Sequence, residues 1–234
     1  MGGRIKRNGE EKPRLPIPAI GSLHIGEKAL SASGKEYPRS LDHFKASGKY
    51  ATLFHDAYGE KPDTIQIVFP SNDASLCCNE YFELRDAQGK LVADGDGEEF
   101  RVWSAKENTY KMLSTADYPN LMDMVKNRYV GSDWKVTLKL SFIIPRVRGV
   151  MGVWTLTTKG SASSIPQVRD AFDQMIEMQG KVAGIIFDLS VKMHSSNKPG
   201  DRSKYPVLTL CANESLPNLE MVKECSKPLM LEDR

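Results

Sequence analysis

The densest group of chemically active side chains is an acidic turn, DGDGEE, at residues 94–99. Carboxylates this close together suit Mg²⁺ or Ca²⁺ binding, or an acid–base pair for hydrolysis. An EF-hand loop beginning at Asp94 requires glycine at its sixth position and glutamate at its twelfth, where the sequence has Glu99 and Ala105. The glycines are typical of a tight hairpin turn. We therefore interpret the cluster as a turn and expect no metal and no catalytic residues, with a hydrolase as the alternative.

The sequence lacks the motifs of the common enzyme classes. It has no phosphate-binding loop, nucleophile elbow, Rossmann glycine fingerprint or His-Glu-x-x-His motif. Cys77 and Cys78 are adjacent, while Cys211, Cys225 and the histidines are scattered without the spacing of metal ligands. We therefore expect reduced thiols, no cofactor and no catalytic activity.

Positive charge gathers in the second half of the chain. Residues 135–204 include eleven lysines and arginines against five acidic residues, whereas residues 83–99 carry an acidic excess. Proteins that bind single-stranded nucleic acid combine basic residues with aromatic side chains on which bases stack. The candidate nucleic-acid-binding residues are Lys135, Lys139, Arg146, Arg148, Trp154, Lys192, Lys198, Arg202 and Lys204. Trp154 has a second interpretation, as a core residue that shares a strand face with Leu156.

The elements that must position these residues are clearest in the second half. Apolar and polar side chains alternate over residues 134–142, which predicts a strand with Lys135 and Lys139 on its polar face. A turn through PRVRG leads to the strand of Trp154. A helix over 164–179 follows, with Ser164 and Gln167 as a capping box and Gly180 at its end. Two further strands, VAGIIFDLSVKMHS and PVLTLCA, flank a basic loop.

The middle of the chain predicts further strands and one short helix. Ile65, Ile67 and Phe69 alternate with polar residues in the strand DTIQIVFPS. Residues 79–104 contain two turn sequences, DAQG and DGDG, between short strands, which predicts a β-meander. The segment DYPNLMDMVKNRY predicts a helix that Asp117 would cap.

The order hairpin, helix, hairpin after earlier strands is typical of an OB-like barrel, in which a helix falls between the third and fourth strands. We expect an α+β fold, mainly antiparallel β, that is either an OB-like barrel or a β-sandwich with one packed helix. Residues 1–60 are rich in Gly, Pro, Ser and Lys and predict an extended N-terminal arm. Residues 61–215 form the predicted mainly-β globular domain, and residues 216–234 a C-terminal tail or short helix.

Composition indicates an ordinary globular protein, with 40% hydrophobic and 26% charged residues and a net charge of +2. The longest apolar stretches fall far short of the roughly 20 residues of a membrane helix. The basic N-terminus has no apolar segment behind it and therefore does not match a secretory signal. We expect a cytoplasmic protein with no membrane partner.

Several segments in combination resemble a bacteriophage family, the recombination directionality factors that partner large serine integrases. The segments are RLPIPAIGSLHIGEK, GKEYPRSLDHF, YGEKPDTIQIVFPSND, ADGDGE and LSFIIPRVRGVMGVWTLTTKGSASS. The resemblance runs from about Arg14 to Leu210. The residues that match the turn and the hairpin are Gly95, Asp96, Gly97, Pro145, Gly149, Gly152, Val153 and Trp154.

The resemblance implies a non-enzymatic phage protein of the bacterial cytoplasm that binds an integrase–DNA complex and shifts recombination towards excision. Relatives are also labelled hydrolase or metal-binding, and many carry a cysteine cluster after the acidic turn that would suit zinc. Residues 100–125 hold no cysteine here, so the metal-binding label does not carry over. Implied partners are DNA, single-stranded or within a recombinase complex, and a serine integrase; a homo-oligomer is a further possibility that the resemblance does not imply. The alternative function is a single-stranded DNA-binding protein of phage replication or recombination.

Overall fold

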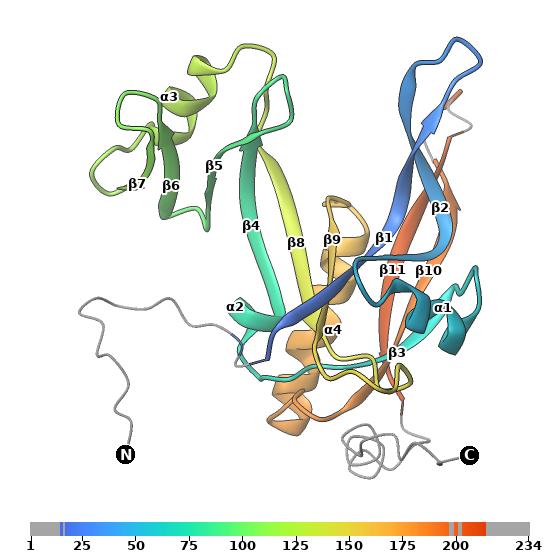
Figure 1. Ribbon diagram of the computed structural model, residues 1–234. Helices are drawn as coiled ribbons and strands as arrows, with labels where there is room; N and C mark the ends of the chain where they lie inside the picture. Colours follow the sequence, from blue (N-terminus) through green and yellow to red (C-terminus); the bar gives the residue numbers. More distant parts are fainter. Residues whose placement is uncertain (1–14, 16, 197–198, 201–202, 214–234) are drawn as a thin grey trace, which may run out of the picture.

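The computed structural model describes residues 15, 17–196, 199–200 and 203–213, and most of them lie in two β-sheets (Figure 1). In sheet order, the larger sheet consists of β2 (Glu36–Ser47), β1 (Ala19–Leu30), β9 (Val153–Thr158), β8 (Lys135–Phe142), β4 (Cys78–Arg85), β5 (Leu91–Gly95), β6 (Glu99–Ser104) and β7 (Thr109–Ser114). The smaller sheet consists of β11 (Lys204–Ala212), β10 (Ile186–Ser195) and β3 (Thr64–Val68). The helices are α1 (Ala51–Tyr58), α2 (Ala74–Cys77), α3 (Leu121–Arg128) and α4 (Ser164–Gln179).

The predicted fold class, α+β with mainly antiparallel strands, is confirmed. Neighbouring strands are antiparallel throughout both sheets, apart from the parallel pair β1 and β9. The larger sheet is open, with β2 and β7 at its edges, so no closed barrel forms. A bridge between Val68 and Ile143 links the two sheets, and both sheets contribute to one core.

The segment predicted to be an extended arm supplies two long strands and a helix of this core. β1 lies between β2 and β9, and Phe44 of β2 and Phe54 of α1 are fully buried. The strand pair was missed because Gly26 and Pro38 interrupt the alternation of apolar residues, and because β1 pairs with β9, more than a hundred residues away. The division of the chain into domains stays a prediction, and residues 216–234 lie outside the described residues.

The main core lies between the two sheets and α4. Phe69 directly follows β3 of the smaller sheet. Its ring centroid lies 5.0 Å from that of Phe172 of α4 and 5.4 Å from that of Phe187 of β10. From the larger sheet, β8 contributes Leu138, Leu140 and Phe142, which confirms the predicted apolar face of that strand.

A second, smaller core lies under the outer strands of the larger sheet. It joins Leu84, Val92, Ala93, Phe100 and Val102 to Leu121 and Val125 of α3. Figure 1 shows α3 with β5, β6 and β7 at one end of the molecule, and β1, β2 and the smaller sheet at the other. The long strands β4 and β8 run from one core to the other, so the larger sheet is a continuous platform across both.

Two predicted helix caps are wrong, although both helices form. α3 begins after Asn120 rather than at Asp117. α4 begins after Ser163 and ends at Gly180, whose φ of 70° is the left-handed conformation expected there. Ser164 is fully buried, and its Oγ accepts a hydrogen bond from the Leu208 N–H of β11 at 3.0 Å. The sequence places a capping residue at this position, whereas the fold uses its hydroxyl to fix α4 to the smaller sheet.

Candidate functional site: a polar trough on the larger sheet

Polar side chains cover the face of the larger sheet that points away from its cores. Strand pairing forms a row across five strands: Lys135 is opposite Glu83, Glu83 opposite Asp94, Asp94 opposite Arg101, and Arg101 opposite Met112. Side chains of directly paired residues lie about 4.5–5.5 Å apart at Cβ, so the charges of this row interact.

Two open hollows lie side by side on this face, and we call them together the trough. The first has a volume of about 420 Å³ and the second about 340 Å³, and both are lined by Asn79 and Lys139, where they meet. The remaining walls of the first hollow are Tyr81, Glu83, Arg85, Leu91, Asp94, Gly95, Asp96, Glu99, Arg101 and Met112. Those of the second are Leu15, Ile17, Ala19, Ser75, Leu76, Ser141, Val153 and Thr155.

Glu83 is a buried carboxylate in the floor of the trough, 2% exposed. The Arg85 Nε and Nη2 atoms donate to its two oxygens at 3.1 Å each, and Lys159 Nζ forms a second ion pair with it. Burial raises the pKa of Glu83, but the hydrogen bonds from Arg85 and Lys159 outweigh burial and hold the pKa below its ordinary value. Glu83 is therefore an ionised, fully paired group.

Within the acidic turn, Asp94 is paired with a cation in a similar way. The Arg101 Nε and Nη2 atoms donate to the two Asp94 oxygens at 2.8 Å each, and the Arg101 guanidinium lies 4.8 Å from the centroid of the Tyr110 ring. Asp96 Oδ1 accepts the backbone N–H groups of Glu98 and Glu99 at 2.9 and 2.8 Å. The predicted hairpin turn is confirmed, and the part of the chain that the structure describes contains no group of three or more ligands placed to hold a metal ion.

Lys139 is the exposed cation at the centre of the trough. Within the described residues, its side chain forms no ion pair or hydrogen bond, and the same is true of the side chains of Asn79 and Tyr81 beside it. Burial, followed by the nearby Glu83 carboxylate, raises the pKa of Tyr81, so its hydroxyl stays protonated and able to donate. The Thr137 hydroxyl, paired across the strands with Tyr81, is buried and has no partner in the described chain. The centre of the trough thus holds unused hydrogen-bonding capacity.

Trp154 is a core residue, which decides between its two interpretations. It is 1% exposed, its ring lies 5.8 Å from that of Phe54, and it packs against Gly21 of β1. A Cβ atom at Gly21 would lie 2.5 Å from the indole, so the backbone of β1 rests directly on the ring. The proposed stacking of a nucleic-acid base on Trp154 is wrong because no face of the indole reaches solvent.

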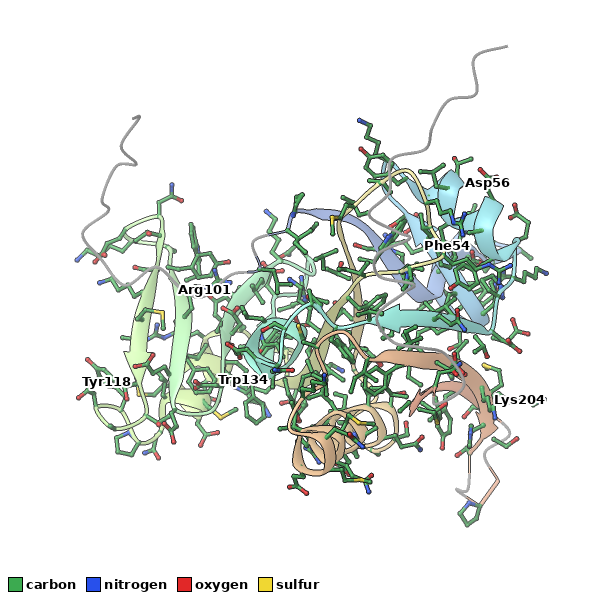
Figure 2. All side chains as sticks on the ribbon, turned by 90° about the horizontal axis from the view of Figure 1, so that it is seen from below. Phe54, Asp56, Arg101, Tyr118, Trp134 and Lys204 are labelled. Carbon is green, nitrogen blue, oxygen red and sulfur yellow. The ribbon has the colours of Figure 1, made fainter. Side chains whose placement is uncertain are left out.

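The remaining candidate nucleic-acid residues do not form one patch. Arg146 and Arg148 lie in the β8–β9 connection, with the Arg146 guanidinium 5.0 Å from the centroid of the Tyr58 ring of α1. Lys192 and Lys204 lie in the smaller sheet. Lys204 is paired with Ser195, which is three residues from Lys192 on β10, so the two lysine side chains point to opposite faces of the sheet. Figure 2 shows Lys204 on the opposite side of the molecule from Arg101.

Lys135 and Lys139 are the two candidates that the fold brings to the trough face, while Lys198 and Arg202 lie outside the described residues. Sequence reasoning missed Asn79, Tyr81 and Arg101 as their neighbours. The available signal was the alternation in NEYFELR, where Asn79, Tyr81 and Glu83 share one face and Phe82 and Leu84 the other.

Comparison with known proteins places this fold in a family. A family model described as Gp3-like, recombination directionality factor-like, matches residues 20–213, which run from β1 through β11 and contain the trough strands. No curated protein and no solved structure matches the chain. In the described residues, no helix is both long and apolar enough to cross a membrane.

Proposed function

This chain belongs to the Gp3-like, recombination directionality factor-like family, and we propose that it is a phage accessory protein that binds a serine integrase–DNA complex and shifts recombination towards excision. The observation that carries the proposal is the family match over residues 20–213. Because the match includes every described strand, it applies to the whole platform rather than to a single motif.

The chemistry of the trough supports a binding role rather than catalysis. A hydrolase needs a carboxylate free to exchange a proton or to activate water. Asp94 is held by both nitrogens of one guanidinium edge, and Glu83 is held by two cations. Asp96 fixes the turn through two backbone hydrogen bonds. These three carboxylates are committed to the fold. Of the described carboxylates that line the first hollow only Glu99 remains, so the hollow offers no pair of free carboxylates and we assign no catalytic residue.

Single-stranded DNA binding, the alternative function, has less support. It depends on an aromatic stacking platform beside a continuous groove of cations. Trp154 is buried, and the basic residues around it are divided between the trough, the β8–β9 connection and the smaller sheet. A protein partner that itself holds the DNA needs neither feature.

A recombination assay tests the proposed function. Purified protein is added to the serine integrase of the same phage, with DNA that carries either the two unrecombined attachment sites or the two recombinant junctions. We expect the protein to promote recombination of the junctions and to suppress recombination of the unrecombined sites. If neither reaction changes, the proposed function is wrong.

The Asp96→Asn variant is the matched control in that assay. Its amide oxygen can still accept the turn hydrogen bonds, so the fold is kept while a carboxylate is removed. A binding protein retains its effect on recombination in this variant. A protein that acts through carboxylate chemistry at this turn loses it.

A further inference from the structure

We propose that the trough binds a segment of the integrase that presents one carboxylate side chain to Lys139, an inference that rests on the proposed function. It adds to that function the surface used and the chemistry of the group that is recognised.

Charge is the first reason. The other cations in the first hollow are Arg85 and Arg101, and each donates hydrogen bonds from its Nε and Nη2 atoms to one carboxylate. Lys139 has no such partner in the described chain and is exposed where the two hollows meet. Lys139 is therefore the cation of the first hollow that has no carboxylate partner in the described chain, while Glu99 and Asp96 lie at the acidic turn of the same hollow. A partner carboxylate would give Lys139 the kind of ion pair that Arg85 and Arg101 already have.

Shape and hydrogen bonding are the second reason. The Asn79 amide and Tyr81 hydroxyl lie beside Lys139 and can donate to the same carboxylate or to an adjacent peptide carbonyl. The floor runs obliquely from Thr155 to Asp94. It crosses β9, β8, β4 and β5, about 14 Å at roughly 4.8 Å per strand, and it also shifts along β8 from Ser141, opposite Thr155, to Lys135, in the row of Asp94, about 20 Å further. The diagonal of these two distances is about 24 Å, which an extended segment of about seven residues spans at roughly 3.3 Å per residue. Any chain lying along the trough must pass over Lys139.

The distribution of acidic groups favours a protein segment over nucleic acid. A nucleic-acid strand carries one phosphate per nucleotide and requires several cations along its path. Here Glu99 and Asp96 line the same hollow as Lys139 and would repel neighbouring phosphates. Glu99 has no ion pair in the described part of the chain, so its charge is not compensated. A protein segment needs only one anionic group, at Lys139, and can place an uncharged or basic residue beside Glu99, so it meets less repulsion than a strand with a phosphate at every nucleotide.

The test compares charge reversals at two exposed lysines. Lys139→Glu is set against Lys181→Glu, which makes the same change on the connection between α4 and β10, at an exposed lysine that does not line the trough. Binding to the purified integrase loaded on attachment-site DNA is measured by interferometry at two salt concentrations. We expect Lys139→Glu to weaken binding by about tenfold or more, because it replaces attraction with repulsion. Lys181→Glu should stay within about twofold of the unmodified protein.

Further variants separate recognition of a carboxylate from a structural effect. Lys139→Arg keeps the charge and should retain most of the binding, and all three variants should keep the unmodified melting temperature because both lysines are exposed. Equal effects of Lys139→Glu and Lys181→Glu would overturn the inference while leaving the proposed function intact. Failure of the unmodified protein to bind the integrase would instead remove the proposed function. Binding of free single-stranded DNA that Lys139→Glu abolishes would make nucleic acid the occupant and also overturn the inference.

Discussion

Glu83 is the group whose replacement tests the floor of the trough most severely. Its carboxylate is 2% exposed and receives two hydrogen bonds from Arg85 and an ion pair from Lys159, which comes from the segment between β9 and α4. The Glu83→Gln variant removes the negative charge and turns an amide N–H₂ group towards two cations. We expect a loss of folding stability without a change of fold.

The magnitude follows from what replaces the lost contacts. Hydrogen bonds to charged groups contribute about 1.5–3 kcal/mol each. The side chains of Arg85 and Lys159 are 45% and 43% exposed, so water takes over part of their solvation when the carboxylate is lost. We therefore expect a loss of about 3 kcal/mol, near the lower end of the range for a broken buried ion pair. For a chain of this length that loss lowers the melting temperature by about 6–12 °C.

Thermal and urea unfolding at neutral pH measure this loss, with Glu27→Gln as the matched control. Glu27 also binds two cations, Arg39 and Lys45, but on the exposed β1–β2 hairpin, so its replacement should cost clearly less than that of Glu83. The pKa of Glu83 is lower in the folded protein than its ordinary value of 4.5. Its contribution is therefore present above pH 4.5 and is lost as the pH falls through the folded pKa. A Glu83→Gln variant within about 0.5 kcal/mol of the unmodified protein would refute the role assigned to this network.

Two substitutions and one labelling experiment test the packing of the larger sheet. Gly21→Ala should destabilise the fold by about 1–3 kcal/mol in urea unfolding, because its Cβ would lie 2.5 Å from the Trp154 ring; an unchanged midpoint would contradict that contact. Thr137→Val removes a buried hydroxyl that has no partner in the described chain and should be neutral or stabilising by about 1 kcal/mol, whereas a clear loss would indicate a missed hydrogen bond. In native thiol labelling, Cys211 should react while Cys78 does not, since burial raises the pKa of Cys78 to about 12; fast labelling of Cys78 would show that its strand opens.

The sequence predicts the strands of the second half well because their alternation is regular. In β8 the residues from Lys135 to Phe142 switch between faces without interruption, and the observed core follows that pattern. The acidic turn is predicted equally well, because Gly97 adopts a φ of 111°, which a tight turn requires and which other residues rarely adopt. In both cases the signal lies within a few consecutive residues.

The features that the sequence did not predict depend on contacts between distant segments. The sequence left open whether Trp154 is a core or a stacking residue, and the answer follows from the approach of Gly21, which is brought there by the parallel pairing of β1 with β9. The buried role of Ser164 follows from its hydrogen bond to Leu208 of β11. The trough itself depends on strand register, which sets Asn79 against Lys139 and Glu83 against Lys135. A shift of one residue would place those side chains in the core.

The measurement that tests the central claim most directly is a gel-shift experiment with the integrase and one recombinant junction DNA. A factor that acts through the recombinase should retard the integrase–DNA complex further and should leave free DNA unshifted at the same concentration. That result is the one we predict for this chain. A shift of free DNA without integrase, or an integrase–DNA complex that the protein does not alter, would contradict it.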